Sequence, residues 1–273
     1  MTELSVYTVY LRELARENFP ELLRRLSERS VSGADIIDDE LSTLPLEEYT
    51  RVLRSVGMKP SALVITEDFV TADDREEVFS KIQGQIYEME KAGVPLLMAA
   101  PSIRLTKTDE EPAELRDRMI EGLGRIIGLA EKAGIRVVIE NQSSIMRPDS
   151  RARDLRYILD ALPSLGFVFD SGNFYPIGED ALCSFDILSD RIEHVHMKDW
   201  IRDPLGKMKT WSGERLSGCA IGEGFLPNGK IAKRLSEIGY RGRVTLEINA
   251  TDIDENMLIK SADHLRRIIL NQE

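Results

Sequence analysis

A strict alternation of short apolar runs with longer amphipathic segments is the feature that most constrains the fold of this chain. The apolar runs have strand length and are rich in β-branched residues, and each is followed by apolar residues at helical spacing. The pattern predicts strands at residues 4–10, 33–38, 61–69, 94–102, 135–141, 166–173, 192–199 and 242–249. Eight such units are typical of a parallel (β/α)8 barrel, because parallel strands require helical crossovers. We therefore predict an α/β fold, a closed (β/α)8 barrel in which residues 1–273 form a single domain.

Proline and glycine mark several boundaries of the predicted helices. Helical segments are expected after every strand, the first four at residues 13–29, 45–57, 72–91 and 112–134. Pro45 lies near the start of the second segment, while Gly57 and Gly93 follow predicted helix ends. Glycine is favoured there because it adopts the left-handed backbone conformation that closes a helix.

The composition describes a globular chain without a nucleic-acid or membrane partner. Apolar residues make up 42% of the 273 residues, which is enough for a sizeable core. The formal net charge of -11 repels a polyphosphate backbone, so no nucleic acid is expected as a partner. Cys183 and Cys219 are too few for a disulfide framework, and no segment resembles a signal peptide or a transmembrane span. We expect a cytoplasmic protein.

Two of the three histidines lie in the stretch IEHVHMKDW, residues 192–200. Side chains alternate between the two faces of a strand, so His194, His196 and Lys198 are expected on one face. A lone histidine on such a strand is more often a core residue that is hydrogen-bonded to its neighbours. A functional role becomes the better interpretation only if carboxylates are expected at the same place.

Three predicted strands end in a carboxylate after an apolar run, VVIE at Glu140, FVFD at Asp170 and VTLE at Glu247. A buried carboxylate is costly unless a partner or a metal ion compensates its charge. The carboxyl ends of barrel strands meet at one rim, so these residues and His196 are expected to converge. Three carboxylates and one imidazole suit one divalent ion, Mn2+, Mg2+, Co2+ or Zn2+. Each residue alone is better explained by a salt bridge or a helix cap, but the four together favour a metal site.

Lys198 and His194 are expected beside these four residues. Lys198 lies one step further along the strand face that carries His196. Its ammonium would either act on a substrate oxygen or form a salt bridge to a rim carboxylate, and both interpretations stay open. His194 lies one layer deeper, so we expect it to hold the site by hydrogen bonds without touching the ion.

The combination of VVIEN, FDSGN, HVHMKD, a GEG turn at residues 222–224 and IGYRGRVTLEIN resembles the xylose isomerase-like TIM barrel family. Members of this family are usually described as sugar phosphate isomerases or epimerases. The resemblance implies a xylose isomerase-like TIM barrel with one divalent metal ion. In ketose 3-epimerases and inosose-processing relatives, such an ion is bound by the residues that match Glu140, Asp170, His196 and Glu247.

The resemblance also implies roles for individual residues. The two matching glutamates also move protons in such relatives, which makes Glu140 and Glu247 candidate catalytic residues. Lys198 is the third candidate, because of its place on the strand face that carries His196. The candidate substrate contacts are Asn173, His194, Arg202 and Trp200. Arg202 lies six residues after His196, where the 3-epimerases place a substrate-binding arginine, although an ordinary surface arginine is as common at such a place.

Two positions depart from the ketose 3-epimerases. Those enzymes carry a histidine three residues after the matching aspartate, where this chain has Asn173. They also carry a second substrate-facing glutamate where this chain has Met146 and Arg147. The sequence therefore does not specify the 3-epimerase reaction, although the expected metal ligands are all present.

The same superfamily contains endonuclease IV, which repairs abasic DNA with a cluster of zinc ions. That cluster needs several more histidines at strand ends. Here His264 is the only one left, and it lies on the last predicted helix. A trinuclear zinc site is therefore not expected.

The predicted site suggests its chemistry. An ion that chelates a hydroxyl and a neighbouring carbonyl stabilises the enediolate that forms when a glutamate removes the proton between them. We predict a divalent-metal-dependent isomerase or epimerase of a small sugar, polyol or sugar-derived keto compound. The alternatives are a dehydratase on the same site, of the inosose or 3-dehydroshikimate type, and a non-catalytic binding barrel. A small carbohydrate-like molecule is the expected partner, and the question of a homo-oligomer stays open.

Overall fold

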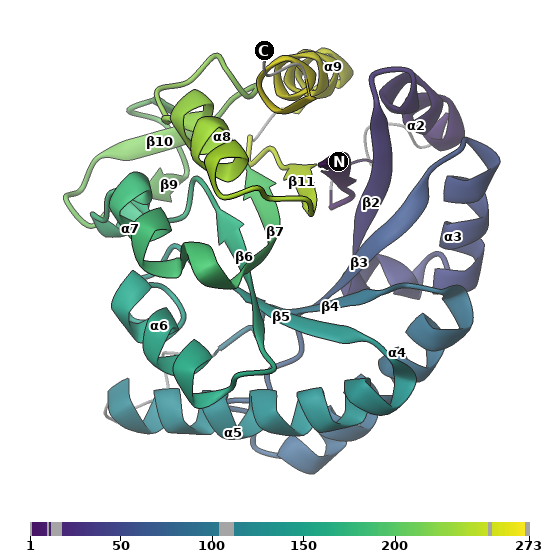
Figure 1. Ribbon diagram of the computed structural model, residues 1–273, viewed down its shortest axis with the longest axis vertical. Coiled ribbons are helices and arrows are strands. Elements are labelled where there is room, and N and C mark those ends of the chain that lie inside the picture. Colours follow the sequence, from purple (N-terminus) through teal and green to yellow (C-terminus); the bar gives the residue numbers. More distant parts are fainter. Residues whose placement is uncertain (1, 10, 12–17, 104–111, 251–252, 271–273) are drawn as a thin grey trace.

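The strands of the computed structural model form a closed barrel with helices on its outer side (Figure 1). The structure describes residues 2–9, 11, 18–103, 112–250 and 253–270. Neighbouring barrel strands are parallel and follow the order β1-β11-β7-β6-β5-β4-β3-β2. Their bounds are β1 (Glu3–Tyr7), β2 (Val31–Ile37), β3 (Lys59–Ile65), β4 (Leu96–Ala99), β5 (Arg136–Glu140), β6 (Gly166–Asp170), β7 (Ile192–Met197) and β11 (Arg243–Leu246). The predicted (β/α)8 TIM barrel is confirmed.

Each barrel strand is followed in the chain by a helix that packs against the outside of the barrel (Figure 1). These helices are α2 (Phe19–Ser27), α3 (Leu46–Ser55), α4 (Arg75–Ala92), α5 (Pro112–Ala130), α6 (Ala152–Ala161), α7 (Ala181–Leu188), α8 (Asn228–Glu237) and α9 (Glu255–Leu265). Helix α4 is closed by Gly93 in the left-handed conformation, as the sequence predicts. Tyr10 of the first predicted strand and the start of the predicted helix 13–29 lie outside the described residues.

The barrel interior has an apolar side and a polar side. A small apolar cluster takes one residue from each of the strands β2 to β6, namely Ile37, Val64, Met98, Val138 and Val168. Their sequence neighbours Ile36 and Leu63 belong to the larger core between the strands and the helices, because side chains alternate along a strand. Buried polar side chains gather on the other side, from β1, β2, β7 and β11, and include Ser5, Asp35, His194, His196 and Thr245. This polar side leads to the strand ends that carry the predicted site.

The barrel strands end earlier than the sequence pattern suggests. β3 ends at Ile65 rather than at residue 69, and β7 ends at Met197 rather than at residue 199. Beyond β3 the Phe69 N–H donates within a turn to the Glu67 carbonyl, and beyond β7 the Lys198 N–H donates to the Ser171 hydroxyl. Catalytic groups of such barrels stand on these strand ends and on the loops that follow them.

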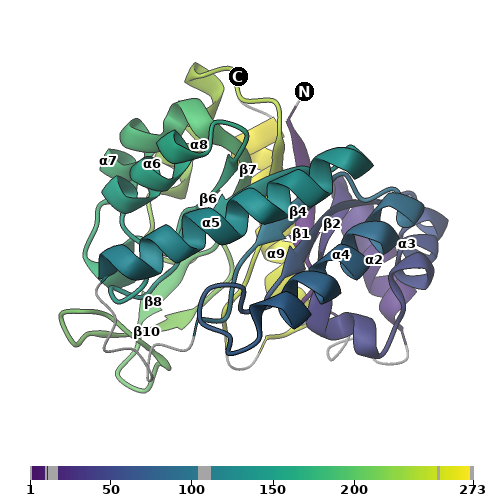
Figure 2. The same ribbon diagram turned by 90° about the horizontal axis from the view of Figure 1, so that it is seen from below.

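A second, antiparallel sheet follows β7, and the sequence pattern did not predict it. Its strands are β8 (Trp200–Arg202), β9 (Met208–Lys209) and β10 (Arg215–Gly218), in the order β8-β10-β9. Figure 2 shows β8 and β10 at one end of the barrel, away from the end at which β1 starts. These strands are short and rich in polar residues, so neither length nor apolar alternation identified them. Among the described residues, no helix is long and apolar enough to cross a membrane.

Candidate metal centre

The four predicted ion ligands lie together at the carboxyl ends of the strands. Glu140 and Asp170 are the last residues of β5 and β6, His196 is near the end of β7, and Glu247 directly follows β11. One ligand atom of each residue lies within 4.8 Å of the ligand atoms of the others. All four side chains are buried, with exposed fractions between 0% for Asp170 and 8% for Glu140. The structure therefore brings together residues from four strands that are adjacent in the barrel.

His196 and Lys198 lie at the middle of this group. His196 Nδ1 is 2.8 Å from Glu140 Oε1 and 3.0 Å from Glu247 Oε2. Lys198 Nζ is 2.9 Å from Asp170 Oδ2 and 2.6 Å from Glu247 Oε1. Of the two interpretations of Lys198, the salt bridge to the rim carboxylates is the one that the structure contains. The two cationic groups thus share Glu247 between them.

The sequence DSGN, which begins at Asp170, explains how this carboxylate is aimed. Its Oδ1 accepts hydrogen bonds from the backbone N–H groups of Gly172 and Asn173, at 2.7 and 3.0 Å. This leaves Oδ2 to face the centre. Position 172 has to be glycine, because a Cβ there would overlap the aliphatic part of the Lys198 side chain. The lack of a Cβ at Gly172 therefore allows the lysine to reach the carboxylates.

Asn141 ties the end of β5 to the end of β6. Its Oδ1 accepts from the Asp170 N–H at 2.8 Å, and its Nδ2 donates to the Asp170 carbonyl at 3.1 Å. Asn173 Nδ2 in turn donates to the Asn141 carbonyl at 2.8 Å. Because these side chains satisfy the backbone groups at both strand ends, Asp170 is held in a fixed frame. Asn173 therefore contributes to the frame, and its Oδ1 also lies 3.4 Å from Lys198 Nζ.

Burial and close opposite charges shift the pKa values of the group strongly. Burial would lower the pKa of Lys198, but Asp170 and Glu247 outweigh it and hold that pKa well above its usual value. Burial would raise the pKa of Glu247, but Lys198 and His196 lower it to about 2. Burial raises the pKa of Asp170 to about 7, although Lys198 opposes the shift. The facing carboxylates raise the pKa of His196 against the effect of its burial.

The donor set and its unsatisfied atoms fit a divalent cation. Among the described residues, Glu140 Oε1 and Asp170 Oδ2 are buried without a hydrogen bond of good geometry, and only cationic neighbours compensate their charge. Buried polar atoms normally have partners, and an oxygen atom without one at such a place is a candidate ligand atom. Carboxylate oxygens with one imidazole nitrogen are ligands that Mn2+, Mg2+ and Zn2+ accept.

The remaining predicted substrate contacts lie elsewhere. His194 does not reach the four ligand atoms, and its Nε2 bonds to Asp35 and Thr245 instead. Arg202 has a side chain that is 59% exposed, and its Nε donates to Glu214. Trp200, which was also predicted as a substrate contact, is only 1% exposed. Its indole N–H donates to the carbonyl of residue 172, so it supports the loop after β6.

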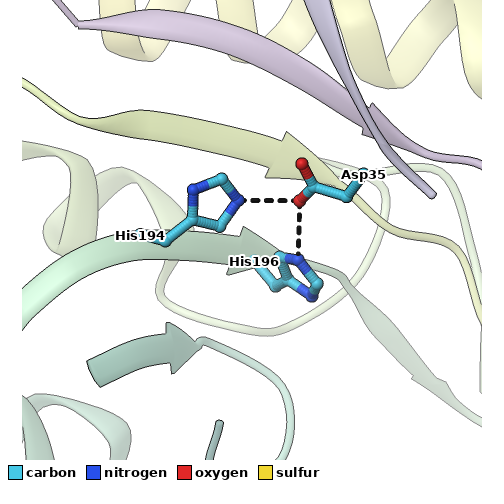
Figure 3. A group of neighbouring side chains, drawn as sticks. All are labelled: Asp35, His194 and His196. Carbon is cyan, nitrogen blue, oxygen red and sulfur yellow. Dashed lines mark hydrogen bonds and ion pairs between the residues drawn. The ribbon is translucent and has the colours of Figure 1, made fainter. Parts of the chain in front are cut away.

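Three residues beside the centre were missed in the sequence. Asp35 on β2 is completely buried and bonds to both histidines of β7 (Figure 3). The Tyr7 ring lies 5.4 Å from the His196 ring, measured between centroids. Asn249, with its amide turned to satisfy both atoms, donates to Glu247 Oε1 and accepts from Lys198 Nζ, each at 3.2 Å. A carboxylate inside the apolar run of β2 was a signal that could have identified Asp35.

Comparison with known proteins identifies relatives of the whole barrel. An inosose dehydratase of Mesomycoplasma hyopneumoniae strain J is 23% identical over 271 residues, covering 96% of this chain and 80% of the relative. The structure of the IolI protein with a bound zinc atom superposes with a TM-score of 0.80 at 17% identity, covering 100% of this chain and 99% of the other. The D-psicose 3-epimerase of Clostridium cellulolyticum H10, solved with D-tagatose, gives 0.74 at 16% identity, with 96% of each chain covered.

The model of the family described as xylose isomerase-like TIM barrel matches residues 21–268. The match includes all barrel strands except β1, and with them the four grouped ligand residues. The resemblance found in the sequence motifs is therefore confirmed, and this chain belongs to the xylose isomerase-like TIM barrel family.

Proposed function

We propose that the chain is a divalent-metal-dependent dehydratase that acts on a polyol-derived ketone of the inosose type. The observation that carries this proposal is the convergence of Glu140, Asp170, His196 and Glu247 within 4.8 Å, with the Lys198 ammonium against two of them. These four side chains would hold one ion. When bound, the ion would supply Lewis-acid stabilisation of negative charge on the oxygen of an adjacent ketone.

Glu140 is the better placed of the two glutamates to accept a proton from carbon. Glu247 is engaged by Lys198 and His196, and its pKa of about 2 makes it a weak base. Among the described residues, Glu140 pairs with His196 alone, through Oε1 at 2.8 Å, and its Oε2 accepts one longer contact, 3.3 Å from Gln142 Nε2. Carbon acids next to a carbonyl need a base with an accessible oxygen.

The elimination can then be completed by the same carboxyl. Glu140 takes the proton from the carbon next to the ketone, and the electron pair of that bond forms the enolate. As the β-hydroxyl leaves, the carboxyl returns the proton to it, so that water departs and a carbon–carbon double bond remains. Lys198 donates a hydrogen bond to a substrate oxygen and stabilises the charge that develops there.

A dehydratase is preferred over the leading sequence prediction of an isomerase or epimerase. The relative that spans 96% of this chain is an inosose dehydratase, whereas the likeness to the 3-epimerase concerns the fold. The 3-epimerase histidine and its second, substrate-facing glutamate are replaced here by Asn173 and by Met146 and Arg147, and Arg147 is paired with Asp149.

The isomerase or epimerase reaction remains the second candidate because the centre contains two glutamates. Glu140 and Glu247 both contact His196 Nδ1, so the two carboxylates border the same space. A substrate bound between them would meet one carboxylate on either side. Proton transfer from one to the other would then invert or relocate a hydroxyl without loss of water.

One experiment separates the two reactions. The protein is stripped with a chelator, reloaded with Mn2+, Co2+, Mg2+ or Zn2+, and mixed in heavy water with an inosose-type ketone. We expect an ion-dependent loss of water, seen as the absorbance of a conjugated enone and as a mass decrease in the product. Deuterium at the carbon next to the carbonyl, with no loss of water, would support the epimerase instead. No ion-dependent reaction of either kind would contradict the proposed function.

A further inference from the structure

We infer that Asp35 is a positioning residue that holds the His196 ring with its Nε2 protonated and its Nδ1 turned toward the centre of carboxylates. This inference rests on the proposed metal centre and adds to it a residue from β2, a strand that contributes none of the four ligands. Asp35 acts through His196 and does not itself meet the ion or the substrate.

The contacts of Asp35 converge on one oxygen. Its Oδ2 lies 2.7 Å from His194 Nε2 and 3.0 Å from His196 Nε2 (Figure 3). The Thr245 hydroxyl donates to the same oxygen at 2.7 Å. These groups come from β2, β7 and β11, and Asp35 is 0% exposed. The carboxylate therefore joins three strands in the barrel interior, directly below the centre.

Both nitrogens of His196 face carboxylates, on opposite sides of the ring. Nε2 faces the Asp35 carboxylate, so this nitrogen must carry a proton for the contact to be favourable. Nδ1 faces Glu140 and Glu247 and is the nitrogen that would bind an ion in place of a proton. An ion ligand must be an unprotonated nitrogen, and the hydrogen bond at the other nitrogen decides which one that is. Because Asp35 holds the proton on Nε2, Nδ1 is the nitrogen that gives up its proton to an ion.

The geometry argues against a second ion bound by Asp35, His194 and His196. Asp35 Oδ2 already accepts from His194, His196 and the Thr245 hydroxyl. Among the described residues, Glu140 Oε1 and Asp170 Oδ2 by contrast accept no hydrogen bond of good geometry. An ion there would have to displace all three donors.

His194 and Thr245 explain why Asp35 keeps its orientation. Its other oxygen, Oδ1, is buried and has no hydrogen-bond partner among the described residues. The position of the carboxylate is thus set entirely at Oδ2, where two donors besides His196 hold it. His194, expected from the sequence to support the site without touching the ion, would in this arrangement act through its contact with Asp35.

Three variants test the inference. Asp35→Ala removes the acceptor, Asp35→Asn retains a weaker acceptor of the same shape, and Ser61→Ala is the matched control. Ser61 is 3% exposed in the barrel interior and bonds to Ser5 at 2.7 Å, so its loss removes a buried hydrogen bond away from Asp35. Near-ultraviolet circular dichroism of each variant checks that the fold is retained.

The first measurement is the affinity for Zn2+ alone, by competition with a chromophoric chelator. We expect Asp35→Ala to weaken it by about ten- to a hundredfold, the usual effect of losing a group that orients a ligand histidine. Asp35→Asn should weaken it less, and Ser61→Ala should leave it unchanged. Equal affinity of Asp35→Ala and the unmodified protein would overturn the inference, as would an equal loss in Ser61→Ala.

The second measurement is the protonation of ring nitrogens by two-bond 1H–15N correlation spectra. The chain has only three histidines, so the spectrum is simple, and His264 on α9 serves as the internal reference. His196 Nε2 should be protonated with and without Zn2+ in the unmodified protein. In ion-free Asp35→Ala, its ring signals should move toward the opposite tautomer or a mixture of both, because Nδ1 still faces two carboxylates. An unchanged Nε2–H signal in the ion-free variant would contradict the inference.

Failure of the inference can be told apart from failure of the proposed function. If the unmodified protein binds no divalent ion, the proposed function is wrong, and the nitrogen spectra of the ion-free protein still decide the role of Asp35. If it binds two ions and Asp35→Ala binds one, Asp35 is a ligand and the positioning role is wrong. One ion in both, with lower affinity in the variant, supports both proposals.

Discussion

At the scale of residues, Lys198 occupies a place that a divalent cation would share. Its ammonium is buried between Asp170 and Glu247. Among the described residues, it is the only cationic group within contact distance of Asp170 Oδ2. Breaking a buried ion pair from one side leaves an uncompensated charge and typically costs about 3–5 kcal/mol. The lysine therefore keeps the ion-free centre folded, whatever it does toward a substrate.

We predict that Lys198→Met destabilises the ion-free protein far more than the ion-loaded protein. An ion would compensate the carboxylates that the lysine leaves behind, so excess Zn2+ should recover much of the loss. Urea unfolding with EDTA and with Zn2+ measures both values. Lys260→Met, which removes an exposed lysine paired with Glu223, is the matched control and should change little in either condition. An identical loss of stability with and without Zn2+ would argue against a site that Lys198 and the ion share.

We also predict that Glu140→Gln lowers turnover by a factor of about 10² or more, as expected for loss of a positioned general base. The amide keeps an oxygen ligand, so Zn2+ affinity should fall less than it does in His196→Ala. Initial rates and chelator competition measure the two effects. Glu223→Gln, an exposed exchange of the same kind, should retain full turnover. Turnover of Glu140→Gln near the unmodified rate would rule out the assigned proton acceptor.

The sequence predicted the four grouped residues because each closes an apolar run or shares a strand with another histidine. It did not single out Asp35, since this aspartate lies inside its strand and its histidine partner is 159 residues away in the chain. The burial of Trp200 was likewise not foreseen, because it depends on the loop after β6 closing over the indole. Pairings set by tertiary packing leave no local pattern that spacing arguments detect.

At the scale of elements, the small sheet of β8, β9 and β10 lies against the loop that carries the last glutamate of the site. Gly218 ends β10, and a Cβ at this position would overlap the backbone of Asn249 and Ala250. Asn249 itself contacts Glu247 and Lys198. The sheet is therefore coupled to the centre by direct backbone contact. The barrel strands could be predicted from their apolar runs. The close approach of β10 to the loop after β11 could not, because the role of Gly218 depends on residues that are distant in the sequence.

We predict that Gly218→Ala costs about 1–3 kcal/mol of stability, the usual penalty for overpacking. It should also weaken Zn2+ binding, because the backbone next to Glu247 has to move. Gly229→Ala is the control, since a Cβ at that position of α8 meets nothing within 4 Å and should be neutral or stabilising. Chemical denaturation and chelator competition on both variants test this. A Gly218→Ala protein with unchanged Zn2+ affinity would show that the sheet is independent of the centre.

At the scale of the whole molecule, closure of the barrel brings the two ends of the sheet together. β1 pairs with β11 in parallel register, from Glu3 opposite Arg243 to Val6 opposite Leu246. The four candidate ligands lie on β5, β6 and β7 and directly after β11, so an ion held by them would join strands across half of the closed ring. An ion that binds only the closed form stabilises it by mass action.

We predict that Zn2+ at a hundredfold excess over its dissociation constant stabilises the folded chain by about 2.7 kcal/mol, and that EDTA removes this gain. The thermal midpoint, followed by circular dichroism at several Zn2+ concentrations, measures the effect. It should be absent in a Glu140→Ala, Asp170→Ala double variant. A midpoint that does not depend on Zn2+ would contradict ion binding by the folded barrel.

Closure has a further consequence while the chain is being synthesised. Strands leave the ribosome in sequence order, so β7 appears before the neighbour, β11, that completes its pairing. During this interval the growing sheet has an open edge, and open edges invite pairing with other chains. His194, His196 and Lys198 stand along or just past that edge, with their partners Thr245 and Glu247 still to come. The unfinished sheet therefore carries polar side chains and one lysine on or just past its edge strand, a feature that disfavours edge-to-edge pairing.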